Sequence, residues 1–184
     1  MGRMRVCVFC GSTPGTDPAF TEAALELGGG LARAGIGLVY GGGASGLMGS
    51  VSEGALAAGG EVVGVIPTAL VERELARHDV TDLRVVDSMH ERKALMYDLA
   101  DAFVTLPGGF GTFDEFFETI TWSKLGLHAK RSLVLDVGGY YEPLRALVAH
   151  AATSGFLRSG DPDLVSFHTD VASVLAELTA TLSA

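Results

Sequence analysis

The segment from Leu106 to Gly126, LPGGFGTFDEFFETITWSKLG, joins a glycine-rich turn to a carboxylate and is the first candidate for chemistry. Pro107 and the glycines after it end an apolar, β-prone stretch, and helical spacing follows from Thr112 to Lys124. Thr112 would be the N-cap of this helix. The N–H groups and the positive dipole end of a helix start bind anions, typically phosphate. We therefore expect a phosphate cradle made of Gly108, Gly109, Phe110, Gly111 and Thr112.

Glu115 has two interpretations that the residue pattern leaves open. Three residues after Thr112, it would complete a capping box and so have a purely structural role. Alternatively, it is the catalytic carboxylate of the site. The two roles are compatible in part, because a capped helix holds its first turn rigidly. In a first turn the dipole favours the ionised carboxylate, which fits a base or a cation stabiliser better than a proton donor.

Arg92 is the candidate cation. It shares a helical stripe with Met89 and Met96, so the guanidinium lies on a face that otherwise looks directed to the core. A buried arginine is costly unless it is paired or bound to an anion. A structural pair with Asp101 or Glu115, or snorkelling to the surface, would explain it. The functional alternative is a guanidinium fork aimed into a pocket, with Met89 and Lys93 as further substrate contacts.

A second glycine turn, at Gly41, Gly43 and Gly46, fits the pattern GxGxxG. A dinucleotide site also needs an acidic residue at the end of the next strand, but that strand begins at Glu61 and ends at Pro67, so the pattern argues weakly for NAD. A second interpretation of the turn is a tight bend that needs positive φ. Our preferred interpretation is a turn that lines a nucleotide monophosphate pocket, with contacts from Ser12, Gly43 and Ser45.

The order of predicted elements indicates an α/β fold. Strands and helices alternate, which is typical of a Rossmann-like, doubly wound and mostly parallel sheet with helices on both faces. The length of 184 residues fits a single nucleotide-binding domain, residues 1–184. We expect strands at residues 4–9, 37–40, 61–66, 84–86, 102–106, 132–136 and 164–167, and helices at residues 18–34, 46–58, 89–100, 112–124, 141–154 and 170–182.

Composition excludes several functions. A formal net charge of −9 argues against general binding of nucleic acid or anionic membranes. No apolar run is long enough to span a membrane and no signal peptide is apparent, so we expect a cytoplasmic protein. Cys7 and Cys10 lie three residues apart in a strand-like run and would point to opposite faces, which favours buried free thiols over a shared zinc ligand. The histidines lack metal spacing, so no metal or other cofactor is expected.

PGGFGTFDE resembles the PGGxGTxxE signature of the LONELY GUY family, the cytokinin riboside 5'-monophosphate phosphoribohydrolases that are often mislabelled lysine decarboxylases. SMHERKALM, from Ser88, and GGGASGLMG, from Gly41, resemble two further motifs of that family. The resemblance implies hydrolysis of the N-glycosidic bond of N6-modified adenine riboside 5'-monophosphates or AMP, which releases the base and ribose 5-phosphate. It also implies catalytic Arg92 and Glu115, and substrate contacts at Glu74 and Thr121.

The predicted helix from Thr112 to Lys124 is apolar on two sides, with Phe113, Phe116 and Phe117 on one and Trp122 on another. Such a helix is usually buried on both sides. One side would face the sheet and the other a partner subunit, and the family resemblance implies a homodimer with active sites near the interface. The alternative function is a non-catalytic nucleotide sensor or carrier module of the same architecture, which would not need an Arg92/Glu115 pair.

Overall fold

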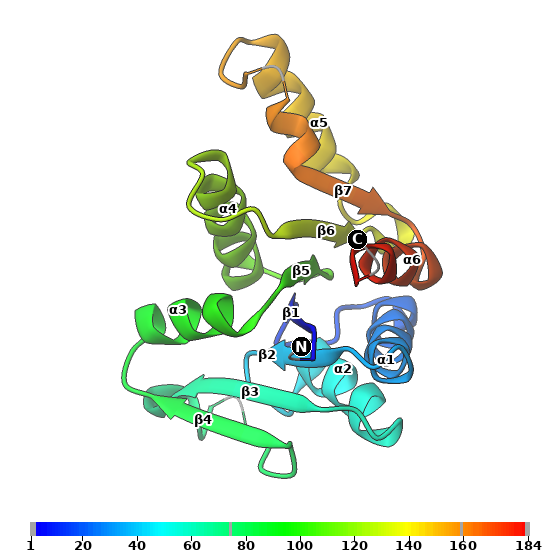
Figure 1. The fold of residues 1–184 in the computed structure, drawn as a ribbon, viewed down its shortest axis with the longest axis vertical. Helices are drawn as coiled ribbons and strands as arrows, with labels where there is room; N and C mark the ends of the chain where they lie inside the picture. The colour runs from blue at the N-terminus through cyan, green and yellow to red at the C-terminus, as the bar shows by residue number, and fades with distance from the viewer. Residues whose placement is uncertain (1–2, 74, 159, 183–184) are drawn as a thin grey trace.

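The computed structural model describes residues 3–73, 75–158 and 160–182 and contains a seven-stranded parallel sheet (Figure 1). The strand order is β4-β3-β2-β1-β5-β6-β7. The strands are β1 (Arg5–Phe9), β2 (Gly37–Tyr40), β3 (Val62–Pro67), β4 (Asp82–Val86), β5 (Ala102–Thr105), β6 (Arg131–Leu135) and β7 (Val165–His168). The helices are α1 (Pro18–Arg33), α2 (Gly46–Ala57), α3 (Met89–Leu99), α4 (Phe110–Lys124), α5 (Glu142–Thr153) and α6 (Val171–Leu182), with short 3₁₀ helices η1 (Thr68–Leu70), η2 (Val137–Gly139) and η3 (Asp161–Leu164).

Helices cover both faces of this sheet, so the predicted doubly wound α/β fold is confirmed. Figure 1 shows α1, α2 and α6 on one side and α3 and α4 on the other. The chain winds outward in one direction from β1 to β4 and in the other from β5 to β7. The order therefore reverses between β1 and β5. In open α/β sheets, ligands bind outside the carboxyl ends of the strands at such a point.

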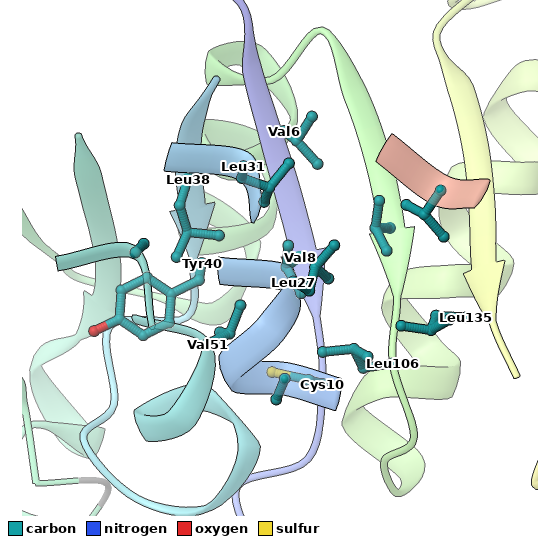
Figure 2. Packing of buried hydrophobic residues seen from close by; sticks show 14 of the residues in the cluster. Val6, Val8, Cys10, Leu27, Leu31, Leu38, Tyr40, Val51, Leu106 and Leu135 are labelled. Atoms are coloured by element: carbon teal, nitrogen blue, oxygen red, sulfur yellow. The ribbon is translucent and has the colours of Figure 1, made fainter. Parts of the chain in front are cut away.

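The core on the α1 side is built from alternate residues of neighbouring strands. Figure 2 shows Val6 and Val8 of β1 beside Leu38 of β2, with Leu27 and Leu31 of α1 packed onto them. Each of these side chains is at most 1% exposed. Burying such aliphatic side chains stabilises the fold by about 1.5–3 kcal/mol each. This layer holds the ends of β1 and β2 in fixed positions.

The two cysteines follow the expected alternation. Cys7 packs with Phe9 on the α3 side of the sheet, whereas Cys10 belongs to the α1 side (Figure 2). Both are buried free thiols, as predicted. Burial raises the pKa of each thiol, and the nearby carboxylate of Glu115 adds to the increase. Both groups are therefore neutral and unreactive near pH 7.

Helix caps explain where several elements begin. Asp17 accepts a hydrogen bond from Ala19 N at 2.9 Å, and Pro18 occupies the first position of α1. At α3, Ser88 Oγ accepts from Glu91 N at 3.1 Å, while the Glu91 carboxylate accepts from the Asp87 amide at 2.9 Å. Among the residues that the structure describes, no helix has the length and apolarity needed to cross a membrane.

Element boundaries differ from the sequence prediction mainly by one or two residues. β4 begins at Asp82 rather than at residue 84, because its pairing with β3 starts at Val63 opposite Asp82. β6 and β7 are each displaced by one residue from the predicted ranges. The largest functional consequence is at α4, which begins at Phe110 instead of Thr112.

Candidate active site

Three loops converge at the carboxyl ends of the strands beside the β1/β5 reversal. Gly11, after β1, donates its N–H to Pro107 O at 3.0 Å and so joins the β1–α1 loop to the β5–α4 loop. Leu47, near the start of α2, donates its N–H to Gly11 O at 3.0 Å. A Cβ on Gly46, whose φ is +58°, would lie 2.3 Å from Ser12 C. Glycine is therefore required where the β2–α2 turn meets the first loop, and Gly46 has the positive φ that the alternative interpretation of this turn predicts.

A cavity of about 200 Å³ opens between these loops and helices α3 and α4. Phe110, at its mouth, is 92% exposed. The lining combines glycine backbone, three methionines, one arginine and two carboxylates. Its residues are Val8, Cys10, Gly11, Ser12, Gly41, Met48, Met89, Arg92, Met96, Gly109, Phe110, Gly111, Thr112, Asp114 and Glu115.

Arg92 is held in the cavity wall by backbone carbonyls. The side chain is only 5% exposed. Nη2 donates to Gly41 O at 2.6 Å and Nε donates to Val65 O at 3.1 Å. A Cβ on Gly41 would lie 2.2 Å from Nη2, so a glycine is needed for the guanidinium to fit. The positive charge is thereby fixed beside the end of β2 and the fourth residue of β3.

One structural explanation of Arg92 is wrong. Asp101 accepts a hydrogen bond from Arg5 N at 2.8 Å, at the start of β1, whereas the cavity lies beyond the end of that strand. Asp101 is therefore at the opposite edge of the sheet and cannot pair with Arg92. Snorkelling is excluded as well, because the guanidinium is buried rather than at the surface.

The predicted capping box at Thr112 and Glu115 is also wrong. Gly109 is the N-cap of α4, in an extended conformation and without a side-chain cap, and Thr112 is the third helical residue. The physical reason is that Gly108 leaves room for Thr112 to fold back: a Cβ there would lie 2.1 Å from Thr112 Oγ1. The pattern T-x-x-E matched residue types only. A related arrangement occurs at α3, where Ser88 caps Glu91 N and the Glu91 carboxylate accepts from the amide of Asp87, the residue before the N-cap.

The start of α4 nonetheless presents the expected donors. The first helical hydrogen bond runs from Phe113 N to Gly109 O at 3.0 Å, so the N–H groups of Phe110, Gly111 and Thr112 precede it. All three residues line the cavity. Tyr141 OH donates to Leu106 O at 2.7 Å and Tyr140 OH to Gly108 O at 2.5 Å, which fixes the loop before the helix. Such a helix start is suited to an anion.

Glu115 is in the second turn of α4, beyond the first turn over which the helix dipole acts on a carboxylate. It lines the same cavity as Arg92. Its backbone carbonyl accepts a hydrogen bond from Thr119 Oγ1 at 2.7 Å. Burial first, and then the charge of Glu115, raises the pKa of the Cys10 thiol, while Arg92 opposes this increase. The carboxylate of Glu115 and the guanidinium of Arg92 therefore lie in the wall of the same cavity.

The other predicted contacts fall into two groups. Ser12 and Met89 line the cavity, whereas Gly108 is outside the lining and packs closely against Thr112 and Gly11. Gly43 and Ser45 belong to the β2–α2 turn but are outside the lining; Gly43 forms an antiparallel bridge with Ala76, and Ser45 precedes α2 without a side-chain cap. Glu74 lies outside the described residues.

Lys93 and Thr121 are also separate from the lining. Lys93 Nζ pairs with two carboxylates of α4, Asp114 and Glu118. Thr121 is exposed and faces a second, apolar cavity of about 420 Å³ between α4, α5, η3 and β7. That cavity is lined by Phe116, Phe117, Ile120, Thr121, Lys124, Leu125, Val148, Leu157, Asp161, Leu164, Val165 and Phe167.

Sequence reasoning assigned no substrate contact to some of the residues in the lining. Gly41 and the Cys10-Gly11 pair were recognisable, because they directly follow strands. Asp114 was recognisable only as a neighbour of Glu115. Met48 and Met96 follow ordinary core spacing, so no sequence signal distinguishes them from packing residues.

Comparison with known proteins identifies relatives across most of the chain. A family model described as "possible lysine decarboxylase" matches residues 48–178. A cytokinin riboside 5'-monophosphate phosphoribohydrolase of Rhodococcoides fascians is 45% identical over 174 residues, 94% of this chain and 88% of that protein. One of Arabidopsis thaliana with the same activity in its name is 47% identical over 153 residues, 83% of this chain and 70% of that protein.

Solved structures share the fold at lower identity. A molybdenum cofactor binding protein of Rippkaea orientalis has a TM-score of 0.77 at 19% identity, with 99% of both chains covered. The molybdenum cofactor carrier protein of Chlamydomonas reinhardtii has a TM-score of 0.74 at 23% identity and full coverage of both chains. At this identity the likeness shows the fold alone. The family model and the sequence relatives carry the assignment: the chain belongs to the "possible lysine decarboxylase" family, among members named cytokinin riboside 5'-monophosphate phosphoribohydrolases.

Proposed function

We propose that this protein hydrolyses the N-glycosidic bond of purine riboside 5'-monophosphates, either N6-modified adenine (cytokinin) nucleotides or AMP. The products are the free base and ribose 5-phosphate, and the reaction would activate cytokinins in the cytoplasm. The observation that carries this proposal is one cavity that holds a buried guanidinium, Arg92, a carboxylate, Glu115, and the donor end of α4. Relatives at 45–47% identity bear the name of this activity, which supports it.

In this mechanism the 5'-phosphate binds the N–H groups of Phe110, Gly111 and Thr112. Binding there holds the ribose over the cavity. The C1'–N bond breaks through an oxocarbenium-like state with positive charge on the sugar. The Glu115 carboxylate stabilises that charge or takes a proton from the attacking water, whose oxygen bonds to C1'. The base leaves with the electron pair of the C1'–N bond and takes up one proton from solvent, which balances the proton that the attacking water loses.

Arg92 has a different task. A guanidinium remains protonated at any physiological pH, so it cannot be the proton donor to the base. Its fixed charge, held by Gly41 O and Val65 O, orients the nucleotide and stabilises electron density on the departing base. A carrier or sensor of the same fold would have the phosphate cradle but no need for this pair of charges. Release of free base distinguishes the hydrolase from the carrier or sensor.

Incubation with a nucleotide panel tests the activity. We expect purine riboside 5'-monophosphates to release free base, and the corresponding nucleosides to react at least tenfold more slowly, because they lack the phosphate whose binding energy positions the ribose. Chromatography of the released base measures both rates. A chelator should not alter them. Equal rates for nucleosides would contradict the phosphate cradle, and stoichiometric binding without release would favour the carrier.

Substitution of Glu115 by glutamine tests its catalytic role. Glu115→Gln removes the charge and nearly preserves the shape. Since Glu115 is no part of a cap, we expect the melting temperature to change by only a few degrees while kcat falls about 10²-fold or more. Asp114→Asn is the comparison, with a fall at least tenfold smaller. Parental turnover of Glu115→Gln would show that the mechanism is wrong.

We further propose that the protein is a homodimer that buries the second cavity. This surface is apolar, and Phe117 and Leu125 along α4 are 44% and 66% exposed. Leu147 of α5 extends the exposed apolar surface beside it. Apolar surface of this extent on one side of a protein is typical of an interface. Thr121 would then lie at the boundary between subunits, which is where the family resemblance implies a substrate contact.

Light scattering tests the association. We expect a mass of twice 19.1 kDa at micromolar concentration, and a monomer for Leu125→Glu, because the new charge would have to be buried unpaired in an apolar interface. Leu25→Glu, on the outer surface of α1, is the matched control and should remain dimeric. A parent protein of 19.1 kDa would contradict the proposal, as would dissociation of the control alone.

A further inference from the structure

Lys93 connects the two helices that carry the proposed catalytic pair. It follows Arg92 on α3, and its ammonium lies 3.0 Å from Asp114 Oδ2 and 3.1 Å from Glu118 Oε2 on α4. These two carboxylates flank Glu115 in the sequence, one residue before and three residues after it. The Lys93 side chain is 12% exposed and that of Glu118 is 26% exposed, whereas Asp114 is 60% exposed, so Glu118 is the more buried of the two partners.

Glu118 is the centre of this connection. Its Oε2 atom also accepts a hydrogen bond from Tyr97 OH at 2.7 Å, one helical turn beyond Lys93 on α3. The same hydroxyl lies 3.3 Å from the backbone oxygen of Glu115. Tyr97 is only 4% exposed, and its ring packs edge-on against Trp122 at 4.9 Å. A buried aromatic residue of α3 thus contacts both the side chain and the backbone of α4.

We propose that Lys93 and Glu118 are positioning residues, which together with Tyr97 form a brace that sets the separation of Arg92 and Glu115. This inference rests on the proposed function. Adjacent residues of a helix move together, so a shift of Lys93 against α4 would carry Arg92 with it. Displacement of a catalytic group by about 1 Å can lower a rate about 10²-fold. The brace holds α3 against α4 at the level where the reaction would occur.

The charges support positioning over phosphate binding by Lys93. Burial lowers the pKa of Lys93, but its hydrogen bonds to Asp114 and Glu118 outweigh this effect, so the pKa is raised overall. One ammonium faces two carboxylates here. A phosphate that approached Lys93 would meet their negative charge, whereas the first turn of α4, which carries the N–H groups, contains no acidic residue. We therefore assign Lys93 to the contact between α3 and α4, and Arg92 to substrate binding.

The test is a double-mutant cycle on the full-length protein. Lys93→Met keeps most of the aliphatic stem and removes the charge, and Glu118→Gln keeps the shape of the other partner. We expect each to lower kcat for the nucleotide monophosphate about tenfold or more, with KM within about threefold of the parent value. The double variant should be no slower than the slower single variant, because both act through one contact. Lys93→Arg should recover most of the turnover.

Arg84→Met is the matched control, because it breaks the 2.9 Å pair with Asp82 on β4, and its kcat should equal that of the parent. A tenfold rise in KM for the monophosphate, without a rise for the nucleoside, would show that Lys93 binds phosphate and would overturn the inference. So would multiplicative effects in the double variant, or a lower melting temperature with unchanged kcat. If the parent protein releases no base, the proposed function is wrong, and the positioning role of Lys93 and Glu118 is then wrong as well.

Discussion

The burial of one guanidinium constrains most of this site. Moving a charge out of water costs several kcal/mol unless hydrogen bonds and opposite charge compensate. Arg92 meets that requirement with carbonyl oxygens of Gly41 and Val65, at 2.6 and 3.1 Å. Because one acceptor directly follows β2 and the other lies within β3, the position of the charge is set by the sheet itself. α3 must begin where it does for Arg92 to reach them, and residue 41 must lack a side chain.

The opposite wall of the cavity depends on a different set of contacts. The reversal of strand order between β1 and β5 brings the Gly11 loop and the Pro107 loop together, and the hydrogen bond between them fixes the start of α4. That helix contributes both the donor end for an anion and, one turn later, Glu115. α3 and α4, which contact each other on one face of the sheet, therefore carry one charge each. The ion pair between Lys93 of α3 and Glu118 of α4 joins these two helices.

The sequence predicted the elements well because hydrophobic periodicity and glycine turns are local signals. The predicted start of α4 was wrong because Thr112 has the residue type of an N-cap, whereas Gly109 has the backbone conformation of one. Contacts between distant residues were not predictable. Gly41 and Arg92 are 51 positions apart, and only the folded sheet reveals why the first must be glycine. The pairing of Lys93 and the position of Thr121 on another surface were hidden in the same way.

The most direct measurement is the turnover of Gly41→Ala. The added methyl would lie 2.2 Å from Arg92 Nη2, the mobile end of a side chain, so the guanidinium should move while the fold remains intact. We expect a fall in kcat of about 10²-fold, a melting temperature within a few degrees of the parent value, and little additional loss when Gly41→Ala is combined with Arg92→Ala. Parental turnover of Gly41→Ala, with an inactive Arg92→Ala, would contradict the claim that this carbonyl-bound position of Arg92 is the active one.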